Sequence, residues 1–219
     1  MFSTTINGYY ETPVAVLRRF ARPQSPAERC EFCAIPVAPK HRHLLEVAKQ
    51  RLVCVCNACG LGYQNTIGGR FKLIPRNPRR LAEFQIPDAE WEALAFPINV
   101  AFFYHETASD KTVAMYPSPA GAMESLLPLS TWNALTEDAP AVREMESDTE
   151  AFLVNRVAGA SDYFIVPIDA CYALVGLFRA HWRGSSDGET AWDQIGNFFA
   201  ELRETAAVAE QDSERTCHA

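Results

Sequence analysis

Five cysteines stand close together between residues 30 and 60, and their spacing is the strongest chemical signal in the chain. Cys30 and Cys33 form one Cys-x-x-Cys pair, and Cys56 and Cys59 form a second pair after 22 intervening residues. Thiolate sulfurs are preferred ligands of Zn²⁺ and of iron in tetrahedral sites. The two pairs therefore predict a single metal site with four sulfur ligands.

Cys54 and two nearby histidines leave alternatives open. In a strand, Cys54 would share a face with Cys56, so either sulfur could face the ion. A Cys-x-x-Cys loop turns both sulfurs toward one point, whereas Cys-x-Cys in an extended strand spreads them, which favours Cys56. Cys54 is then expected to be a small buried apolar residue. Alternatively, it joins His41 and His43 in a second metal site. Surface or hydrogen-bonding positions are the other interpretation of these histidines.

The predicted ion is zinc, with iron as the alternative. Four thiolates suit both ions, so the spacing of the cysteines does not separate them. A structural zinc site is a closed cage that contributes folding free energy directly, and the cysteine-rich module is small. Because nothing else in the sequence resembles an electron carrier, zinc is favoured over a rubredoxin-like iron.

The segments around the cysteines predict a small β-ribbon. Strands are expected over residues 43–47, 51–55 and 70–74. Gly60 directly follows Cys59, where a tight loop needs a backbone that can approach the ligand sulfur. Ala34 stands at the equivalent place in the first loop and departs from that pattern. The order loop, hairpin, loop, strand is typical of zinc-ribbon and rubredoxin-like modules.

An acidic, aromatic region follows the ribbon and is expected to form a second unit. The fold class is therefore α+β, a zinc-ribbon-like module joined to a domain with helices and a short, mainly antiparallel sheet. The predicted divisions are an extension over 1–27, the ribbon over 28–78, the α+β domain over 79–204 and a flexible tail over 205–219.

Strand and helix signals alternate through this second unit. Strands are predicted over residues 96–104, 112–116 and 163–166. Helices are predicted from Asp88 through Leu94, from Ser118 through Leu127, from Ser147 through Val157 and from Ser186 through Leu202. Residues Asp169 to Trp182 fit a strand or a helix, and Asp169 as a cap favours the helix. The helix starts rest on Ser or Asp caps and on two capping boxes.

Composition places the chain among globular proteins. Its 219 residues are 48% apolar and 11% aromatic, which excludes an intrinsically disordered class. The sequence holds no apolar run of about 18 residues that would predict a membrane span. Residues 1–11 lack the apolar core of a secretory signal. A cytoplasmic location is expected, where reduced, metal-bound cysteines are favoured over disulfides.

The net charge of -7 hides a strong division along the chain. Between residues 18 and 80, thirteen Lys or Arg face three Glu, a balance of +10, so the remaining residues carry -17. This division predicts either a basic patch for an acidic partner or nucleic acid, or two parts of one molecule that neutralise each other. The acidic remainder would repel phosphate, so nucleic acid is the less favoured partner.

No catalytic motif is evident. Glu150 and Asp169 are explained as helix caps, and Cys171 as a buried thiol. The chain has no glycine-rich phosphate loop. The sequence therefore predicts a non-enzymatic protein.

Two segments of the second unit are a candidate partner surface. Tyr116 and Glu124 belong to one segment, and Arg179 and Trp182 belong to the other. Arg and Trp are common anchors of protein interfaces, which favours a peptide- or partner-binding groove. Tight turns and core packing are the alternative explanation.

Several motifs together resemble the signature of an uncharacterised bacterial family encoded beside high-affinity uptake-type nickel-iron hydrogenases. The ribbon motifs are Glu28-Arg-Cys-Glu-Phe-Cys33, His41-Arg-His-Leu44, Cys54-Val-Cys-Asn-Ala-Cys59 and Gly69-Arg-Phe71. The later motifs are Tyr116-Pro-Ser-Pro-Ala-Gly-Ala-Met-Glu-Ser125, Pro167-Ile-Asp-Ala-Cys-Tyr172, Leu174-Val-Gly176, Arg179 and Trp182-Arg-Gly184. The family's Gly-Gly pair after the last motif is Asp187-Gly188 here.

The resemblance implies an accessory role in hydrogenase assembly or electron supply. The expected function is a metal-binding accessory or scaffold protein that docks on a hydrogenase subunit or precursor. A rubredoxin-like electron carrier with iron in the four-cysteine site is one alternative. A zinc ribbon that binds nucleic acid is the other.

Overall fold

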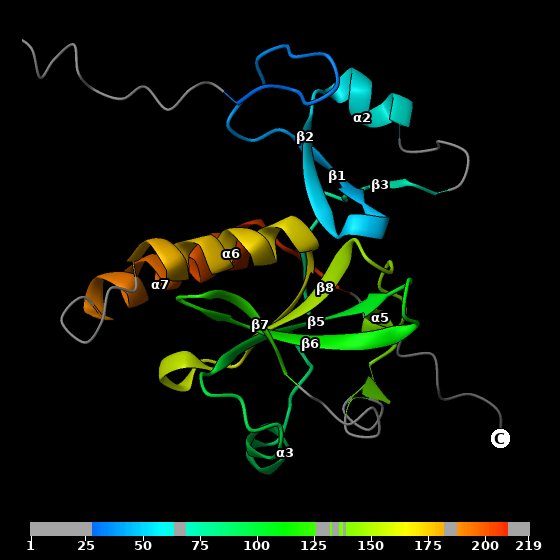
Figure 1. Cartoon of the computed structure of the whole chain (residues 1–219). Helices are drawn as coiled ribbons and strands as arrows, with labels where there is room; N and C mark the ends of the chain where they lie inside the picture. The colour runs from blue at the N-terminus through cyan, green and yellow to red at the C-terminus, as the bar shows by residue number, and fades with distance from the viewer. Residues whose placement is uncertain are drawn as a thin grey trace, which may run out of the picture.

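The chain folds into a mixed α+β structure with two sheets. The computed structural model describes residues 28–63, 69–125, 132, 136–137, 139–181 and 188–209, with only the backbone described for 188–190. The smaller, N-terminal sheet stands above the larger sheet, close to the start of helix α6 (Figure 1). The predicted α+β class with mainly antiparallel sheets is confirmed.

The smaller sheet has three antiparallel strands in the order β2-β1-β3. Its elements are β1 (Arg42–Glu46), the 3-10 turn η1 (Val47–Lys49), β2 (Arg51–Val55), helix α2 (Asn57–Tyr63) and β3 (Phe71–Leu73). The hairpin register pairs His43 with Cys54 and Leu44 with Val53. This is the hairpin and third strand that the sequence predicts.

The larger sheet has seven strands in the order β10-β4-β9-β8-β5-β6-β7. They are β4 (Arg79–Arg80), β5 (Val100–Glu106), β6 (Lys111–Ser118), β7 (Gly121–Ser125), β8 (Glu150–Asn155), β9 (Asp162–Pro167) and β10 (Ala207–Val208). All neighbouring strands are antiparallel except the short pair β10 and β4.

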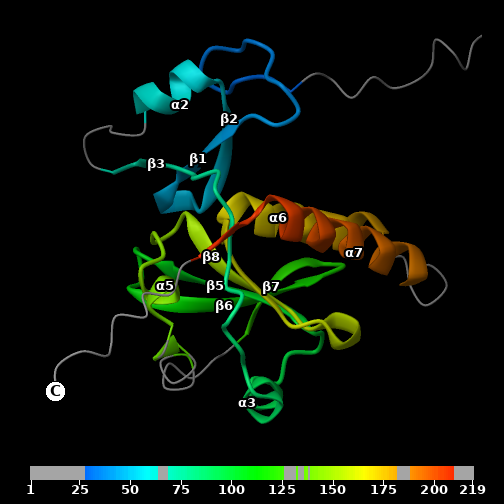
Figure 2. The ribbon, with the colours of Figure 1, turned by 180° about the vertical axis from the view of Figure 1, so that it is seen from behind.

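Helices cover both faces of the larger sheet. Helices α6 (Ile168–His181) and α7 (Gly188–Thr205) lie side by side on one face (Figure 2). The short helices α3 (Asp88–Ala93) and α5 (Pro140–Arg143) and the turn η2 (Val157–Gly159) complete the unit. No helix in the described parts of the chain has the length and apolar character that crossing a membrane requires.

Two apolar clusters fill the faces of the larger sheet, because neighbouring residues along its central strands point to opposite sides. Phe102 and Leu153 pack with α6 and α7 on one face, while Phe103 and Phe152 pack with α3 and α5 on the other. Leu45 of the smaller sheet belongs to the first cluster and is fully buried. The two sheets therefore share part of one core.

The predicted helix from Ser118 through Leu127 is wrong, since Gly121–Ser125 forms strand β7. Ser118 Oγ accepts a hydrogen bond from the N–H of Ala120 at 3.1 Å, as in a turn, and Gly121 has a φ of 130°. A Ser-Pro pair begins turns as well as helices. The hairpin is decided by pairing with β6, which the local signal does not contain.

The predicted helix from Ser147 through Val157 is also wrong, since Glu150–Asn155 is the buried strand β8. The acidic residues of the apparent capping box serve other contacts. Glu150 accepts the Glu146 N–H at 2.9 Å and pairs with Arg79 at 3.0 Å. A short run that is apolar on both faces suits a central strand, and its burial overrides the cap signal.

Three smaller expectations also change. Helix α3 begins at Asp88 with Pro87 at the cap position, and α6 begins at Ile168, so neither Asp88 nor Asp169 is the residue before the helix. The predicted tail contains strand β10, whose Ala207 lies opposite Arg79. Residues 210–219, with Cys217, lie outside the described residues.

Candidate metal centre

The end of strand β2 turns the second cysteine pair toward the first. β2 ends at Val55, so Cys56 leaves the strand and α2 starts immediately after it. The N–H of Cys59 then points at Cys56 Sγ, at 3.4 Å. Cys54, still inside the strand, keeps the ordinary alternation and faces away from the pair.

The first cysteine pair sits on a tight loop next to the smaller sheet. The N–H of Ala34 donates to the Cys30 carbonyl at 2.8 Å, and the Cys30 N–H donates to the Ile35 carbonyl at 2.9 Å. Ala34 closes this loop with a φ of 60°, in the left-handed region that favours glycine. The position that favours glycine is therefore in the first loop, and the chain has alanine there.

Gly60 serves packing instead of loop geometry. It lies inside α2, and a Cβ there would stand 3.4 Å from Arg42 Cδ and 3.4 Å from Val55 Cγ2. Gly60 is not among the glycines with a positive φ, so α2 does not require the backbone freedom of glycine at this position. The glycine lets α2 lie close against the hairpin.

The four predicted ligands converge on one point. The Sγ atoms of Cys30, Cys33, Cys56 and Cys59 all lie within 4.8 Å of one another. Sγ of Cys33 and Sγ of Cys56 are 3.8 Å apart. Four sulfurs at about 2.3 Å from a tetrahedral zinc would stand about 3.8 Å from each other. The cluster therefore fits a tetrahedral ion with little rearrangement.

The same four thiols interact strongly without an ion. Burial raises the pKa of Cys30, but backbone N–H groups of Cys56, Cys33 and Phe32 outweigh it and lower that pKa to about 6. Burial and the neighbouring thiols raise the pKa of Cys59 to about 12. One thiolate forms readily, whereas a full set of four needs a cation to offset their repulsion.

The core around the cluster is small. Cys30 is buried together with Leu44, Val53, Val55 and Phe71 in a cluster separate from the two larger ones. A core of this size contributes little hydrophobic stabilisation, which is the situation in which small modules rely on a metal.

Aromatic rings cover the outside of the cluster. Phe32 stacks on Tyr63 with 4.2 Å between the ring centroids, and its edge meets Phe71 at 5.5 Å. Phe32, Ile35, Leu61 and Tyr63 are nevertheless exposed, and among described residues only Met123 and Val208 are further large apolar side chains of this kind. We call the group of Phe32, Ile35, Leu61 and Tyr63 the knuckle patch. Local sequence patterns do not predict this patch, because Phe32 and Ile35 belong to the first loop and Leu61 and Tyr63 to helix α2.

A second group of metal-ligating side chains lies on the opposite face of the β1 and β2 hairpin. His41, His43 and Cys54 each offer a ligand atom, and these atoms lie within 4.8 Å of one another. Cys54 is half-buried, not fully buried as expected. Asp169, interpreted from the sequence as a helix cap, accepts a 2.8 Å hydrogen bond from His43 Nδ1.

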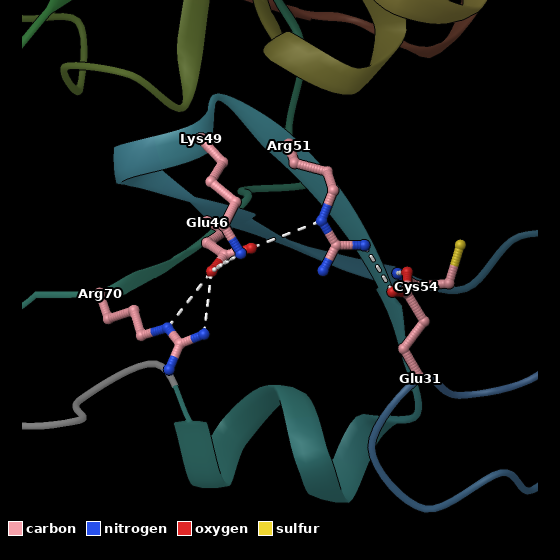
Figure 3. A network of polar contacts seen from close by, with 6 residues as sticks. All are labelled: Glu31, Glu46, Lys49, Arg51, Cys54 and Arg70. Atoms are coloured by element: carbon pink, nitrogen blue, oxygen red, sulfur yellow. Dashed lines mark hydrogen bonds and ion pairs between the residues drawn. The ribbon is translucent and has the colours of Figure 1, made fainter.

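A buried carboxylate holds the basic side of the hairpin together (Figure 3). The Glu46 carboxylate forms ion pairs with Lys49 at 3.1 Å, with Arg51 at 3.4 Å and with Arg70 at 3.0 Å. Hydrogen bonds from Lys49 and Arg70 lower the pKa of Glu46 to about 2. Arg51 also bonds Glu31 at 2.7 Å. Two carboxylates thereby hold three cations, which come from η1, from β2 and from the residue before β3.

Ion pairs within the chain neutralise much of the basic region. Seven of its residues bond acidic partners: Lys40, Lys49, Arg51, Arg70, Lys72, Arg79 and Arg80. Two of these pairs, Lys40 with Glu201 and Lys72 with Asp148, reach from the ribbon to the larger unit. The pairs of Arg79 and Arg80 lie within the larger unit. Of the two interpretations of the charge division, the geometry favours two parts of one molecule that neutralise each other.

The candidate partner surface is divided between two faces. Glu124 lies opposite Met115, on the side of the sheet that α6 covers. Tyr116 is on the other side, with its ring 6.2 Å from that of Phe96. Arg179 is exposed on α6, and Trp182 lies outside the described residues. Tyr116 and Glu124 therefore do not share one face, and partner binding by these residues stays a prediction.

Comparison with known proteins gives one match. A family described as a family of unknown function (DUF5947) matches residues 29–206. This range includes both cysteine pairs, the second histidine and cysteine group, and nearly all of the larger sheet. No curated protein and no solved structure matches the chain.

Proposed function

The chain belongs to the DUF5947 family, and we propose that it is a non-enzymatic metal-binding accessory or scaffold protein that docks on a protein partner. The convergence of Cys30, Cys33, Cys56 and Cys59 carries this proposal. We assign zinc to the site, with the zinc-ribbon-like module as its scaffold. A cytoplasmic location keeps the thiols reduced and available for the ion.

A structural role for the ion follows from the surroundings of the site. Four sulfurs fill a tetrahedron and leave no position for a substrate, which is typical of structural zinc and not of catalytic zinc. The separate core around Cys30 is small, so the ion supplies folding free energy to the ribbon.

The knuckle patch supports docking on a protein. Phe32 and Ile35 of the first loop and Leu61 and Tyr63 of helix α2 expose apolar and aromatic surface on two segments that the ion would hold together. Exposed apolar surface of this kind marks interaction sites, and aromatic residues are enriched in interfaces. The ion would therefore shape the surface that the partner contacts.

The partner class comes from the family resemblance, which points to nickel-iron hydrogenase assembly or function. The test is a pull-down of purified hydrogenase large and small subunits, and of the large-subunit precursor, by the tagged full chain. Ile35→Glu combined with Leu61→Glu should abolish capture while zinc is retained. Met123→Glu changes an exposed apolar residue outside the knuckle patch and should leave capture intact. If the wild type, the double variant and Met123→Glu capture the hydrogenase proteins equally, or if none of them does, the docking proposal is contradicted.

The same preparation distinguishes the alternatives. A red protein with visible absorbance would mean iron in the four-cysteine site and a rubredoxin-like carrier. Binding of nucleic acid that weakens steeply with salt would mean a nucleic-acid-binding ribbon. The internal pairing of the basic residues argues against the latter, because few described cations remain to meet phosphate.

A further inference from the structure

We propose that His41, His43 and Cys54 form a second transition-metal site, separate from the four-cysteine site. The strand register brings them together: His43 lies directly opposite Cys54, and His41 is two residues away on the same face. Their ligand atoms lie within 4.8 Å of one another. This inference goes beyond the proposed function, which concerns the cysteine pairs alone.

The two imidazoles are oriented with Nε2 toward the second site. His41 Nδ1 donates to the Ala38 carbonyl at 2.8 Å, and His43 Nδ1 donates to the Asp169 carboxylate at 2.8 Å. Because carbonyl and carboxylate oxygens only accept, each Nδ1 carries a hydrogen, and Nε2 is the nitrogen that can bind a metal when the ring is neutral. A second-shell oxygen on the far nitrogen is the usual partner of a metal-bound histidine.

His41 Nε2 supplies an independent sign of a ligand. The His41 side chain is only 6% exposed, and its Nε2 has no hydrogen-bond partner among the described residues. A buried acceptor without a partner costs about 1–3 kcal/mol, so such atoms are rare unless something occupies the site. A metal ion between His41, His43 and Cys54 would satisfy it.

Hydrogen bonds of the Cys54 backbone N–H and carbonyl hold this residue in place. Its N–H donates to Glu31 Oε1 at 2.9 Å, and its carbonyl accepts the Glu31 N–H at 2.9 Å (Figure 3). Arg51 holds the second oxygen of Glu31 at 2.7 Å. The strand beside the second site is thus fixed by the same network that surrounds Glu46.

The donor set defines the ion and the character of the site. Two imidazoles and one thiolate suit borderline divalent ions such as Zn²⁺ and Co²⁺ and disfavour Mg²⁺ and Ca²⁺. Three protein ligands leave a fourth position for water or another ligand, as in exchangeable or reactive zinc sites. His41, His43 and Asp169 line a pocket of roughly 370 Å³ between the ribbon and helices α6 and α7, which has room for that ligand.

Zinc counting on the full chain tests this site. Each protein is equilibrated with excess Zn²⁺ and passed through gel filtration, and bound zinc per chain is measured. The wild type should hold two ions, while Cys54→Ala and His43→Gln should each hold one. His181→Gln, a histidine change outside both groups, should hold two. Far-UV circular dichroism and the remaining zinc show that each variant is folded.

Asp169→Asn tests the second shell without removing a ligand. The affinity of the second Zn²⁺, measured by calorimetric titration, should fall about 10- to 100-fold, and the first should not change. A wild type whose single zinc survives Cys54→Ala, a Cys54→Ala protein that holds two, or one that loses the four-cysteine zinc would each overturn the second site. A wild type whose single zinc survives Cys59→Ser and is lost in Cys54→Ala would mean that the four-cysteine site and the proposed function fail while the second site stands.

Discussion

At the scale of single residues, the chemistry depends on which thiols can lose a proton. Cys30 is helped by three backbone N–H groups, whereas Cys59 is hindered by burial and by its neighbours. The local spacing of the cysteines predicts the four candidate ligands, because each Cys-x-x-Cys segment points both of its sulfurs the same way. The protonation of each thiol depends on groups that only the fold brings near.

Replacing a predicted ligand should remove the ion. Cys30→Ser and Cys59→Ser should each lose the four-cysteine zinc, and the ribbon should unfold because its folding depends on the metal. Limited proteolysis together with zinc analysis measures both effects. Cys54→Ser should retain that zinc. A metal-free Cys30→Ser protein that keeps a protease-resistant ribbon would show that the ion is not structural.

Zinc affinity should depend steeply on pH. The pKa of Cys59 is about 12 and that of Cys33 is also raised, so both are protonated at neutral pH and each must lose a proton when zinc binds. These two protons alone make binding about 100-fold stronger for each unit of rising pH, and any further thiol that loses a proton on binding steepens the dependence. Competition with a chromophoric chelator between pH 6.5 and 8 measures the slope. A slope near zero would mean that the four thiols are not the ligands.

At the scale of elements, the sequence predicts the strands of the ribbon correctly but wrongly predicts helices where strands β7 and β8 form. The hairpin over β1 and β2 follows from β-branched and aliphatic runs on either side of a turn. The helices predicted after Ser118 and Ser147 failed because Ser, Asp and Glu also cap turns, and the pairing of β7 and β8 decided the outcome. Local cap signals identify a change of direction, and tertiary contacts choose the element that follows.

The first cysteine loop offers a test at this scale. Ala34 has a left-handed φ of 60°, which costs an alanine about 1–2 kcal/mol. Ala34→Gly should therefore stabilise the zinc-loaded protein by about 0.5–1 kcal/mol after the entropy of glycine is subtracted. Urea unfolding measures the difference. Ala38→Gly, at a position with an ordinary φ, should destabilise it, and a loss of stability in Ala34→Gly would contradict the account of this loop.

At the scale of the whole molecule, long-range pairs join the ribbon to the larger unit. Lys72 Nζ of β3 bonds Asp148 Oδ2 at 2.6 Å, and Asp148 also accepts the Thr107 N–H at 2.8 Å. His43 and Asp169, 126 positions apart, form a second link. Such pairs are not predictable from the sequence, because a charge imbalance does not specify which residues of the two sheets lie next to each other. For the same reason, local sequence predicts a helix cap at Asp169 and not a partner of His43.

Breaking the link at Asp148 should destabilise the whole chain. Burial raises the pKa of Asp148, but Lys72 and Thr107 outweigh it and hold that pKa below its ordinary value. Because the pKa of Asp148 is lower in the folded state than in the unfolded state, its ionised side chain stabilises the fold at pH values above the unfolded-state pKa. This stabilisation is lost as pH falls through the folded-state pKa. Asp148→Asn should cost about 1–3 kcal/mol at neutral pH, because the partly buried Lys72 ammonium loses its charged partner and the hydrogen bonds from Thr107 weaken.

Urea unfolding at pH 7 checks this value for Asp148→Asn. Asp110→Asn is the matched control, since the Asp110 side chain is 94% exposed and should change stability by less than about 0.5 kcal/mol. Equal stabilities for the two variants would show that the pair does not join the sheets.

X-ray absorption at the zinc edge of the Cys54→Ala protein tests the central claim most directly, because this variant keeps only the four-cysteine site. The account predicts one zinc per chain, surrounded by four sulfurs at about 2.3 Å. A metal-free protein, or zinc bound by nitrogen or oxygen in place of four sulfurs, would contradict it.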